Sequence, residues 1–170
     1  MNELWSKISS YNIFNYLFPG AVFSILGERF DVVDSPDAMV ERLIWYYFIG
    51  MAISRVGSVV LEPILRGVSF VKYSEYSSYL RACSFDPKLE LMVEISNTYR
   101  TLVAACALLL LGLFFDWVYL EFGIAAAWKD NVAVLLLCVL FLFSFKKQSE
   151  YVTKRVDRYG VLRVDQEEPK

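Results

Sequence analysis

The chain has 170 residues, of which 56% are hydrophobic and 21% charged, and its formal net charge is −2. A polar surface around so apolar a core is hard to build, so the composition favours a membrane protein and excludes a disordered chain or a charged coiled coil. The sequence has no histidine, which removes the commonest general base and metal ligand, and the small net charge gives no field that attracts nucleic acid. We therefore expect no cofactor, no metal site and no direct binding of nucleic acid.

The first apolar segment covers residues 13–27 and contains polar and helix-breaking residues. Asn15 lies three residues after Asn12, on the same helix face, and Pro19 and Gly20 are residue types that kink or break helices. Broken backbone at membrane depth is tolerated only where it is buried in protein or faces water. Asn15, Pro19 and Gly20 are therefore candidate gating residues of a flexible first helix. The alternative is a short, tilted or re-entrant helix with a structural role.

The second apolar segment, residues 43–65, is long enough to cross a hydrocarbon core, yet it carries Arg55 and Glu62. A charge at membrane depth is costly and normally faces a bundle interior or water. In an α-helix Arg55, Ser58 and Glu62 fall at i, i+3 and i+7, on one face. We take these three residues as candidates for a polar element that lines an aqueous path or switches between subunits. The alternative is a structural ion pair, or a Glu62 that simply lies at headgroup level.

Small residues also recur along the second segment. Gly50, Ser54 and Ser58 are spaced four residues apart, so they form a ridge on one side of a helix. Ridges of this kind let two helices approach closely in a membrane. The ridge predicts a helix-packing surface, and together with the intramembrane charges it makes a homo-oligomer the expected state.

Residues 66–100, between the second and third segments, are expected to form a helical region outside the bilayer. Asp86 followed by Pro87 is typical of a helix N-cap and a first helical position. No breaker separates this point from the third apolar segment, residues 101–120. The third helix is therefore predicted to begin near Pro87 and to continue across the membrane.

Two groups of residues are candidates for binding a cytoplasmic protein partner. Tyr73, Tyr76 and Tyr79 lie three residues apart, so they either pack against the neighbouring helix or form a face that binds a partner or stacks on a nucleotide. The second group, Arg155 and Arg158, belongs to the basic tail that follows the fourth apolar segment. This fourth segment, residues 131–145, is extended by flanking residues to a span of about 127–145.

Basic residues are distributed unevenly, and this asymmetry predicts the orientation. Of the 17 Lys and Arg residues, thirteen lie before the first segment, in the region 66–100 or in the tail 146–170. The positive-inside rule places those parts in the cytoplasm. The sequence thus predicts an all-α, four-helix integral membrane bundle that forms one transmembrane domain over residues 1–170. Both of its termini lie inside, cytoplasmic helical extensions continue its helices, and its spans cover about 13–27, 43–65, 101–120 and 127–145.

Catalytic motifs are missing from the sequence, which contains no GxSxG, HExxH or P-loop pattern. We therefore expect a protein that is not an enzyme. With neither a catalytic nor a metal-binding pattern, the sequence leaves the lipid bilayer and other protein chains as the expected partners.

Two stretches resemble a known group of proteins: SYNIFNYLFPGAVF at residues 10–23 and FSFKKQSEYVTKRV at residues 143–156. They are similar to small four-span bacterial inner-membrane proteins found beside anti-phage defence genes, including nucleotide-signal systems. The resemblance implies a membrane effector or membrane subunit of a defence system, which perturbs or permeabilises the inner membrane when a cytoplasmic partner triggers it. The alternative is a non-conducting membrane anchor or sensor that recruits a soluble cytoplasmic partner.

Overall fold

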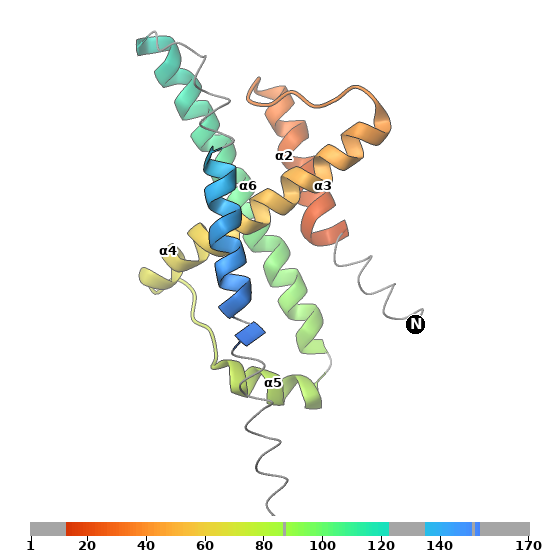
Figure 1. The fold of residues 1–170 in the computed structure, drawn as a ribbon, viewed down its shortest axis with the longest axis vertical. Coiled ribbons are helices and arrows are strands. Elements are labelled where there is room, and N and C mark those ends of the chain that lie inside the picture. Colours follow the sequence, from red (N-terminus) through yellow and green to blue (C-terminus); the bar gives the residue numbers. More distant parts are fainter. Residues whose placement is uncertain (1–12, 87, 123–134, 151, 154–170) are drawn as a thin grey trace, which may run out of the picture. The chain divides into compact units, whose positions relative to one another are not determined.

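The computed structural model describes residues 13–86, 88–122, 135–150 and 152–153, and every regular element within these ranges is a helix (Figure 1). The predicted all-α class is therefore confirmed for the described residues. The chain divides into two compact units, Met1–Trp128 and Lys129–Lys170. In the second unit, residues 135–150 form one helix.

The first unit begins with the π-helix η1, Ile13–Leu17, which continues directly into α2, Phe18–Arg29. The chain does not break at Pro19 and Gly20, so the expected interruption is absent. Pro19 lies in the first turn of α2, and proline lacks the N–H that an α-helix would use to bond the carbonyl four residues earlier. The preceding π-helical turn joins residues five apart, so the helix accommodates Pro19 without ending.

The second helix runs without interruption from α3, Met39–Val56, through the π-helix η2, Gly57–Leu61, into α4, Glu62–Gly67. The sequence predicts that Arg55, Ser58 and Glu62 share one helix face, and the π-helical turn moves Glu62 away from it. Each residue advances an α-helix by about 100°, and a π-helical turn takes up one extra residue. Glu62 is therefore rotated by about 100° from the face that it would share with Arg55 in an unbroken α-helix.

Helices α5, Tyr76–Phe85, and α6, Lys88–Phe122, complete the first unit. As the sequence predicts, α6 starts beside Asp86, whose carboxylate oxygen accepts a hydrogen bond from the Lys88 backbone N–H (3.0 Å). Asp86 thus caps the start of a helix that continues through the third apolar segment.

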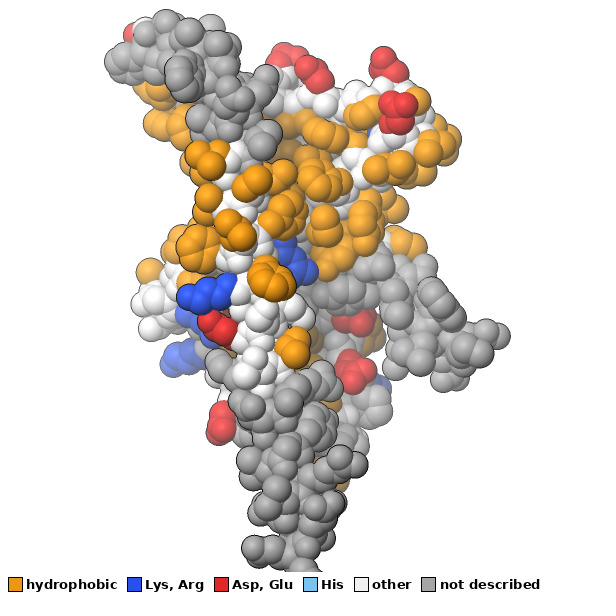
Figure 2. Space-filling model, in the orientation of Figure 1, with side chains coloured by type: hydrophobic (Ala, Val, Ile, Leu, Met, Phe, Trp, Pro, Cys, Tyr) orange, Lys and Arg blue, Asp and Glu red, His pale blue; other side chains and the backbone are white. Residues whose placement is uncertain are grey.

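Two helices are long and apolar enough to cross a membrane: the 29 residues Met39–Gly67 and the 31 residues Lys88–Val118. The first apolar segment is shorter, with 5 residues in η1 and 12 in α2. Of the predicted span at 127–145, the structure describes the helical part from residue 135 onward. Figure 2 shows hydrophobic side chains over α2 and α3 and acidic side chains beyond them at the α2–α3 loop.

Two glycines allow the closest approach between helices in the first unit. A Cβ atom on Gly20 would overlap the carbonyl oxygen of Tyr46, and one on Gly50 would overlap the carbonyl oxygen of Tyr16. The backbones of η1 and α2 therefore lie directly against the backbone of α3 at this crossing. A small apolar core packs nearby, between α2, α3 and α6, and consists of Phe23, Ile53, Ala104, Ala105 and Leu109.

Candidate functional site

Polar side chains gather where η1, α3 and α6 meet, inside a unit that is otherwise mainly apolar. Asn15 and Tyr16 lie in η1, so these two neighbours point from one turn of helix towards two different partners. Asn15 reaches Thr98 of α6, and Tyr16 reaches Arg55 of α3. We call these four residues the polar junction. The junction therefore links the three helices through one π-helical turn.

Asn15 is buried, with 1% of its surface exposed. The Thr98 hydroxyl lies 3.3 Å from the amide oxygen of Asn15 and 3.0 Å from the carbonyl oxygen of Glu94, so its one proton is shared between two acceptors. The amide nitrogen of Asn15 has no hydrogen-bond partner within the described part of the chain. A buried donor left unpaired costs about 1–3 kcal/mol, so this arrangement of the junction is less stable than a fully paired one.

Arg55 is the charge of the junction. Its guanidinium donates a hydrogen bond to the Tyr16 hydroxyl (3.1 Å), and the Tyr16 ring packs edge-on against the Tyr47 ring, with centroids 5.6 Å apart. None of the salt bridges among the described residues includes Arg55. Arg55 and Glu62 therefore do not form the ion pair that the sequence leaves open as an alternative, because the π-helical turn η2 lies between them and rotates Glu62 towards α6.

Glu62 instead joins α4 to α6. Its two carboxylate oxygens each lie 2.8 Å from a guanidinium, one from Arg66 a turn later and the other from Arg100 of α6. The Glu62 side chain is 9% exposed and that of Arg100 is 20% exposed, whereas Arg66 is 49% exposed. The Glu62–Arg100 pair is thus the more buried contact, and it lies two residues along α6 from Thr98.

The small residues of the second segment are divided between different neighbours. Gly50 lies at the crossing with η1 and α2, and Ser54 is buried at 6% exposure. Ser58 is half-buried. Gly57, which the ridge does not include, faces α6, where a Cβ atom would lie 3.4 Å from the Arg100 carbonyl oxygen. Gly50 and Ser54 are therefore occupied within one chain, so they are not free to pack against a second copy.

The three tyrosines around α5 have different surroundings. Tyr73 is exposed, and the Arg66 guanidinium lies 4.0 Å from its ring centre. The Tyr76 and Tyr79 rings lie 6.3 Å apart. A hydrogen bond with Cys83 and, as a smaller cause, burial raise the pKa of Tyr79 to about 12. Tyr73 thus lies beside Arg66, whereas Tyr76 and Tyr79 lie beside each other. The partner-binding candidates Arg155 and Arg158 lie outside the described residues.

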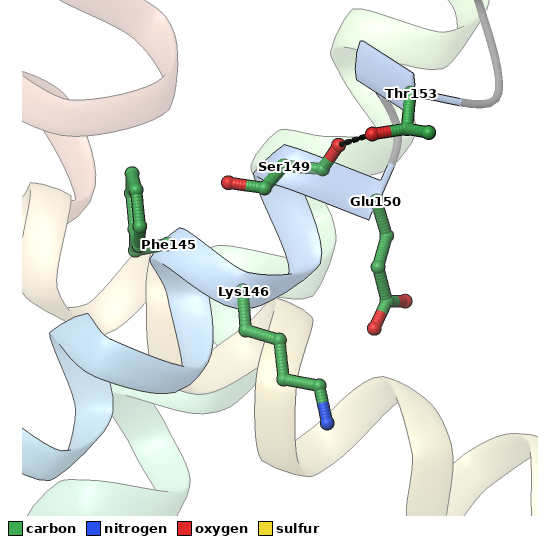
Figure 3. Close-up of a pocket in the computed structure, with 5 residues that line it drawn as sticks. All are labelled: Phe145, Lys146, Ser149, Glu150 and Thr153. Atoms are coloured by element: carbon green, nitrogen blue, oxygen red, sulfur yellow. Dashed lines mark hydrogen bonds between the residues drawn. The ribbon is translucent and has the colours of Figure 1, made fainter.

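A shallow depression lies on the helix of the second unit (Figure 3). Its lining residues Phe145, Lys146, Ser149, Glu150 and Thr153 succeed one another along a single helical stretch, and the Thr153 hydroxyl donates to the Ser149 carbonyl (3.1 Å). One helix alone does not enclose a ligand. Among the described residues no group of His, Cys, Asp and Glu side chains is arranged to hold a metal ion.

Sequence reasoning selects Asn15, Arg55 and Glu62 but not their partners Tyr16, Thr98 and Arg100. Arg100 directly precedes the apolar run of α6, and its position at this edge was the one available signal of a partner for Glu62. Comparisons of the chain with protein-family models, with curated proteins and with solved structures find no match.

Proposed function

We propose that the protein is an integral protein of the bacterial inner membrane that crosses the bilayer as a four-helix bundle with both termini in the cytoplasm. Two helices of sufficient length and apolar character support this proposal. Large side chains on α6 are also open to the surroundings, among them Leu111 (49% exposed) and Phe115 (51% exposed). Lipid would cover these side chains, whereas water would leave a large unfavourable apolar surface.

We further propose that the protein is a membrane effector, or the membrane subunit of one, and that the polar junction is its gate. The hydrogen bond between Arg55 and Tyr16, across two helices and beside a π-helical turn, carries this proposal. A charge placed among apolar helices is rare and is usually functional. In the closed state the Tyr16 hydroxyl accepts a hydrogen bond from the Arg55 guanidinium. When a cytoplasmic partner displaces η1, Arg55 and Asn15 become available to water and line a polar path.

The setting in which such a gate works follows from the resemblance of the two ends of the chain to membrane proteins of anti-phage defence loci. An effector of this kind stays closed in an uninfected cell and permeabilises the inner membrane when a defence partner is triggered. The amide nitrogen of Asn15, which has no partner among the described residues, suits this role, because a closed state that is not fully satisfied needs less energy to open.

The test is a leak assay on the purified full chain in liposomes of phosphatidylethanolamine and phosphatidylglycerol. Tyr16→Phe removes the hydroxyl that Arg55 contacts but keeps the ring. A hydrogen bond to a charged group contributes about 1.5–3 kcal/mol, so its loss shifts the closed–open equilibrium by about tenfold or more. We expect the K⁺ leak of Tyr16→Phe to exceed that of the wild-type chain by about tenfold.

Tyr47→Phe is the matched control, since it removes a hydroxyl from the ring that packs on Tyr16 without touching the contact to Arg55. It should leak as little as the wild-type chain. Equal leak from all three proteins, at equal insertion, would contradict a gate at the junction and would favour the alternative function.

The alternative is a non-conducting anchor that recruits a soluble cytoplasmic partner. Two exposed aromatic side chains favour it: Phe70, 78% exposed in the α4–α5 loop, and Phe85, 87% exposed at the end of α5. Under this alternative, replacing both with serine removes the in-cell activity, whereas Tyr16→Phe leaves both the leak and the activity unchanged.

A further inference from the structure

Helix α6 buries one side and exposes an apolar stripe on the other. Thr101, Ala104 and Ala105 are buried against the rest of the first unit. On the opposite side, large side chains with exposed fractions of 45–68% recur along the helix: Met92, Ile95, Tyr99, Val103, Leu110 and Trp117. Cys106 and Phe114 are also exposed and fill the gaps, so the spacing is three or four residues throughout. We call these eight residues the outer stripe.

Lipid covers only part of the outer stripe, if the protein crosses the membrane as proposed above. The apolar run of α6 begins at Thr101, whereas Glu94 and Arg100 mark the stretch before it as polar. Met92, Ile95 and Tyr99 belong to this earlier stretch and are 45–65% exposed. Within the described part of the first unit, these side chains remain largely uncovered. The continuous stripe therefore needs a protein surface that covers both its lipid-exposed and its water-exposed part.

A second copy of the chain fits this requirement. Membrane insertion gives every copy the same orientation, so two α6 helices would pair in parallel and each stripe residue would meet its own counterpart. Between Met92 and Trp117 the stripe carries no charge, because Glu94, Arg100 and Asp116 fall on other sides of the helix. Spacings of three and four residues keep the stripe on one side of the helix, and their order, 3-4-4-3-4-4-3, is the 11-residue repeat with which helices pack in a right-handed supercoil.

The size of the stripe also fits a stable pair. Its residues extend over roughly 38 Å of helix at 1.5 Å per residue. Eight side chains of this size, each about half exposed, would bury on the order of 800 Å² per copy, which is the area of a standard specific interface. Gly50 and Ser54 of α3 are buried within one chain, so they do not compete for the second copy. We propose that the protein forms a parallel homodimer through the outer stripe of α6.

Disulfide cross-linking in intact membranes tests this pairing, with Cys106 as a native probe in a Cys83→Ser, Cys138→Ser background. Two cysteines form a disulfide only when their Cα atoms lie within about 7 Å, which a parallel pair allows at stripe positions. We expect a covalent dimer from Cys106 after oxidation, and also from Val103→Cys and Leu110→Cys once Cys106 is replaced by serine. Leu111→Cys is the matched control, because Leu111 is 49% exposed but lies off the stripe, and we expect at least tenfold less dimer from it.

Three results would overturn the pairing: equal cross-linking at Leu111 and at the stripe, no dimer from any stripe position, or an intramolecular bond between Cys106 and Cys138 in the wild-type chain. The last result would mean that helix 135–150 of the same chain covers the stripe. Carbonate extraction separates this failure from that of the proposed function. If the chain resists extraction but does not cross-link, only the proposed dimer is contradicted. If carbonate removes the chain from the membrane, both the dimer and the proposed function are contradicted.

Discussion

At the scale of single residues, the charged side chains of the second apolar segment have partners that their spacing in the sequence does not suggest. Arg55 and Glu62 stand out in the sequence because charges are rare in apolar segments, and both join specific contacts in the structure. Their partners, however, are Tyr16 for Arg55 and the arginines of α4 and α6 for Glu62. A sequence reveals that a charge needs a partner, but an extra residue in a helical turn decides which neighbour it meets.

Glu62→Gln tests how much the buried ion pair between Glu62 and Arg100 stabilises the fold. The substitution keeps the shape of the side chain but leaves the guanidinium of Arg100, 20% exposed, without its carboxylate. Loss of one partner from a buried pair is strongly destabilising, and we expect about 2–3 kcal/mol here because the pair is partly open to its surroundings. For a chain of this size the melting temperature should fall by about 5–10 °C in detergent.

Arg66→Gln is the control for this prediction. It removes the other cation beside Glu62, but Arg66 is 49% exposed and an exposed pair contributes at most about 1 kcal/mol. Its melting temperature should stay within about 3 °C of the wild-type value. Equal losses from Glu62→Gln and Arg66→Gln would show that the contact to Arg100 has no special weight.

At the scale of elements, the helices themselves follow from the sequence, but their irregularities do not. Long apolar runs and the cap at Asp86 predict the helix Met39–Gly67 and the start of α6. Neither η1 nor η2 has a sequence signal, because a π-helical turn depends on packing against neighbouring helices. Gly20 follows a proline, a pair that suggests a helix break, yet it lies inside α2. There it lies against Gly50 at the crossing with α3. Glycine both breaks helices and lets backbones touch, so the choice between these roles needs the tertiary structure.

A series of glycine-to-alanine substitutions tests the crossing of η1 and α2 with α3. A Cβ atom on Gly20 or Gly50 meets backbone carbonyl oxygen, which cannot move aside as a side chain does. Overpacking costs about 1–3 kcal/mol or more, so Gly20→Ala and Gly50→Ala should lose about 5–10 °C of melting temperature or fail to accumulate.

Two other glycines complete the series and keep it informative if those variants fail to accumulate. Gly57→Ala would make an ordinary contact at 3.4–3.5 Å with α6, so it should lose only a few degrees. A Cβ atom on Gly67 meets nothing within 4 Å, and Gly67→Ala should match the wild-type chain. A Gly20→Ala or Gly50→Ala variant as stable as Gly67→Ala would contradict the close approach.

At the scale of the whole molecule, charge is segregated along the first unit. The α2–α3 loop carries Asp31, Asp34 and Asp37. The continuous helix formed by α3, η2 and α4 begins after this loop, and Arg66 lies near its other end. Apolar side chains lie between these ends (Figure 2). The positive-inside rule, which counts Lys and Arg, favours the Arg66 end as the cytoplasmic one in the proposed orientation. The net charge of −2 conceals this asymmetry, because it adds the two faces together.

Membrane insertion in this orientation is the central claim, since the gate and the dimer both depend on it. A cysteine-free chain with a single new cysteine, either Asp34→Cys or Lys72→Cys, can be labelled in bacterial spheroplasts with a maleimide that does not cross membranes. Both positions are exposed, one in the α2–α3 loop and the other between α4 and α5. We predict that Asp34→Cys is labelled in intact spheroplasts and that Lys72→Cys is labelled only after permeabilisation. Labelling of both positions in intact spheroplasts, or the reverse pattern, would contradict the proposed crossing of the membrane.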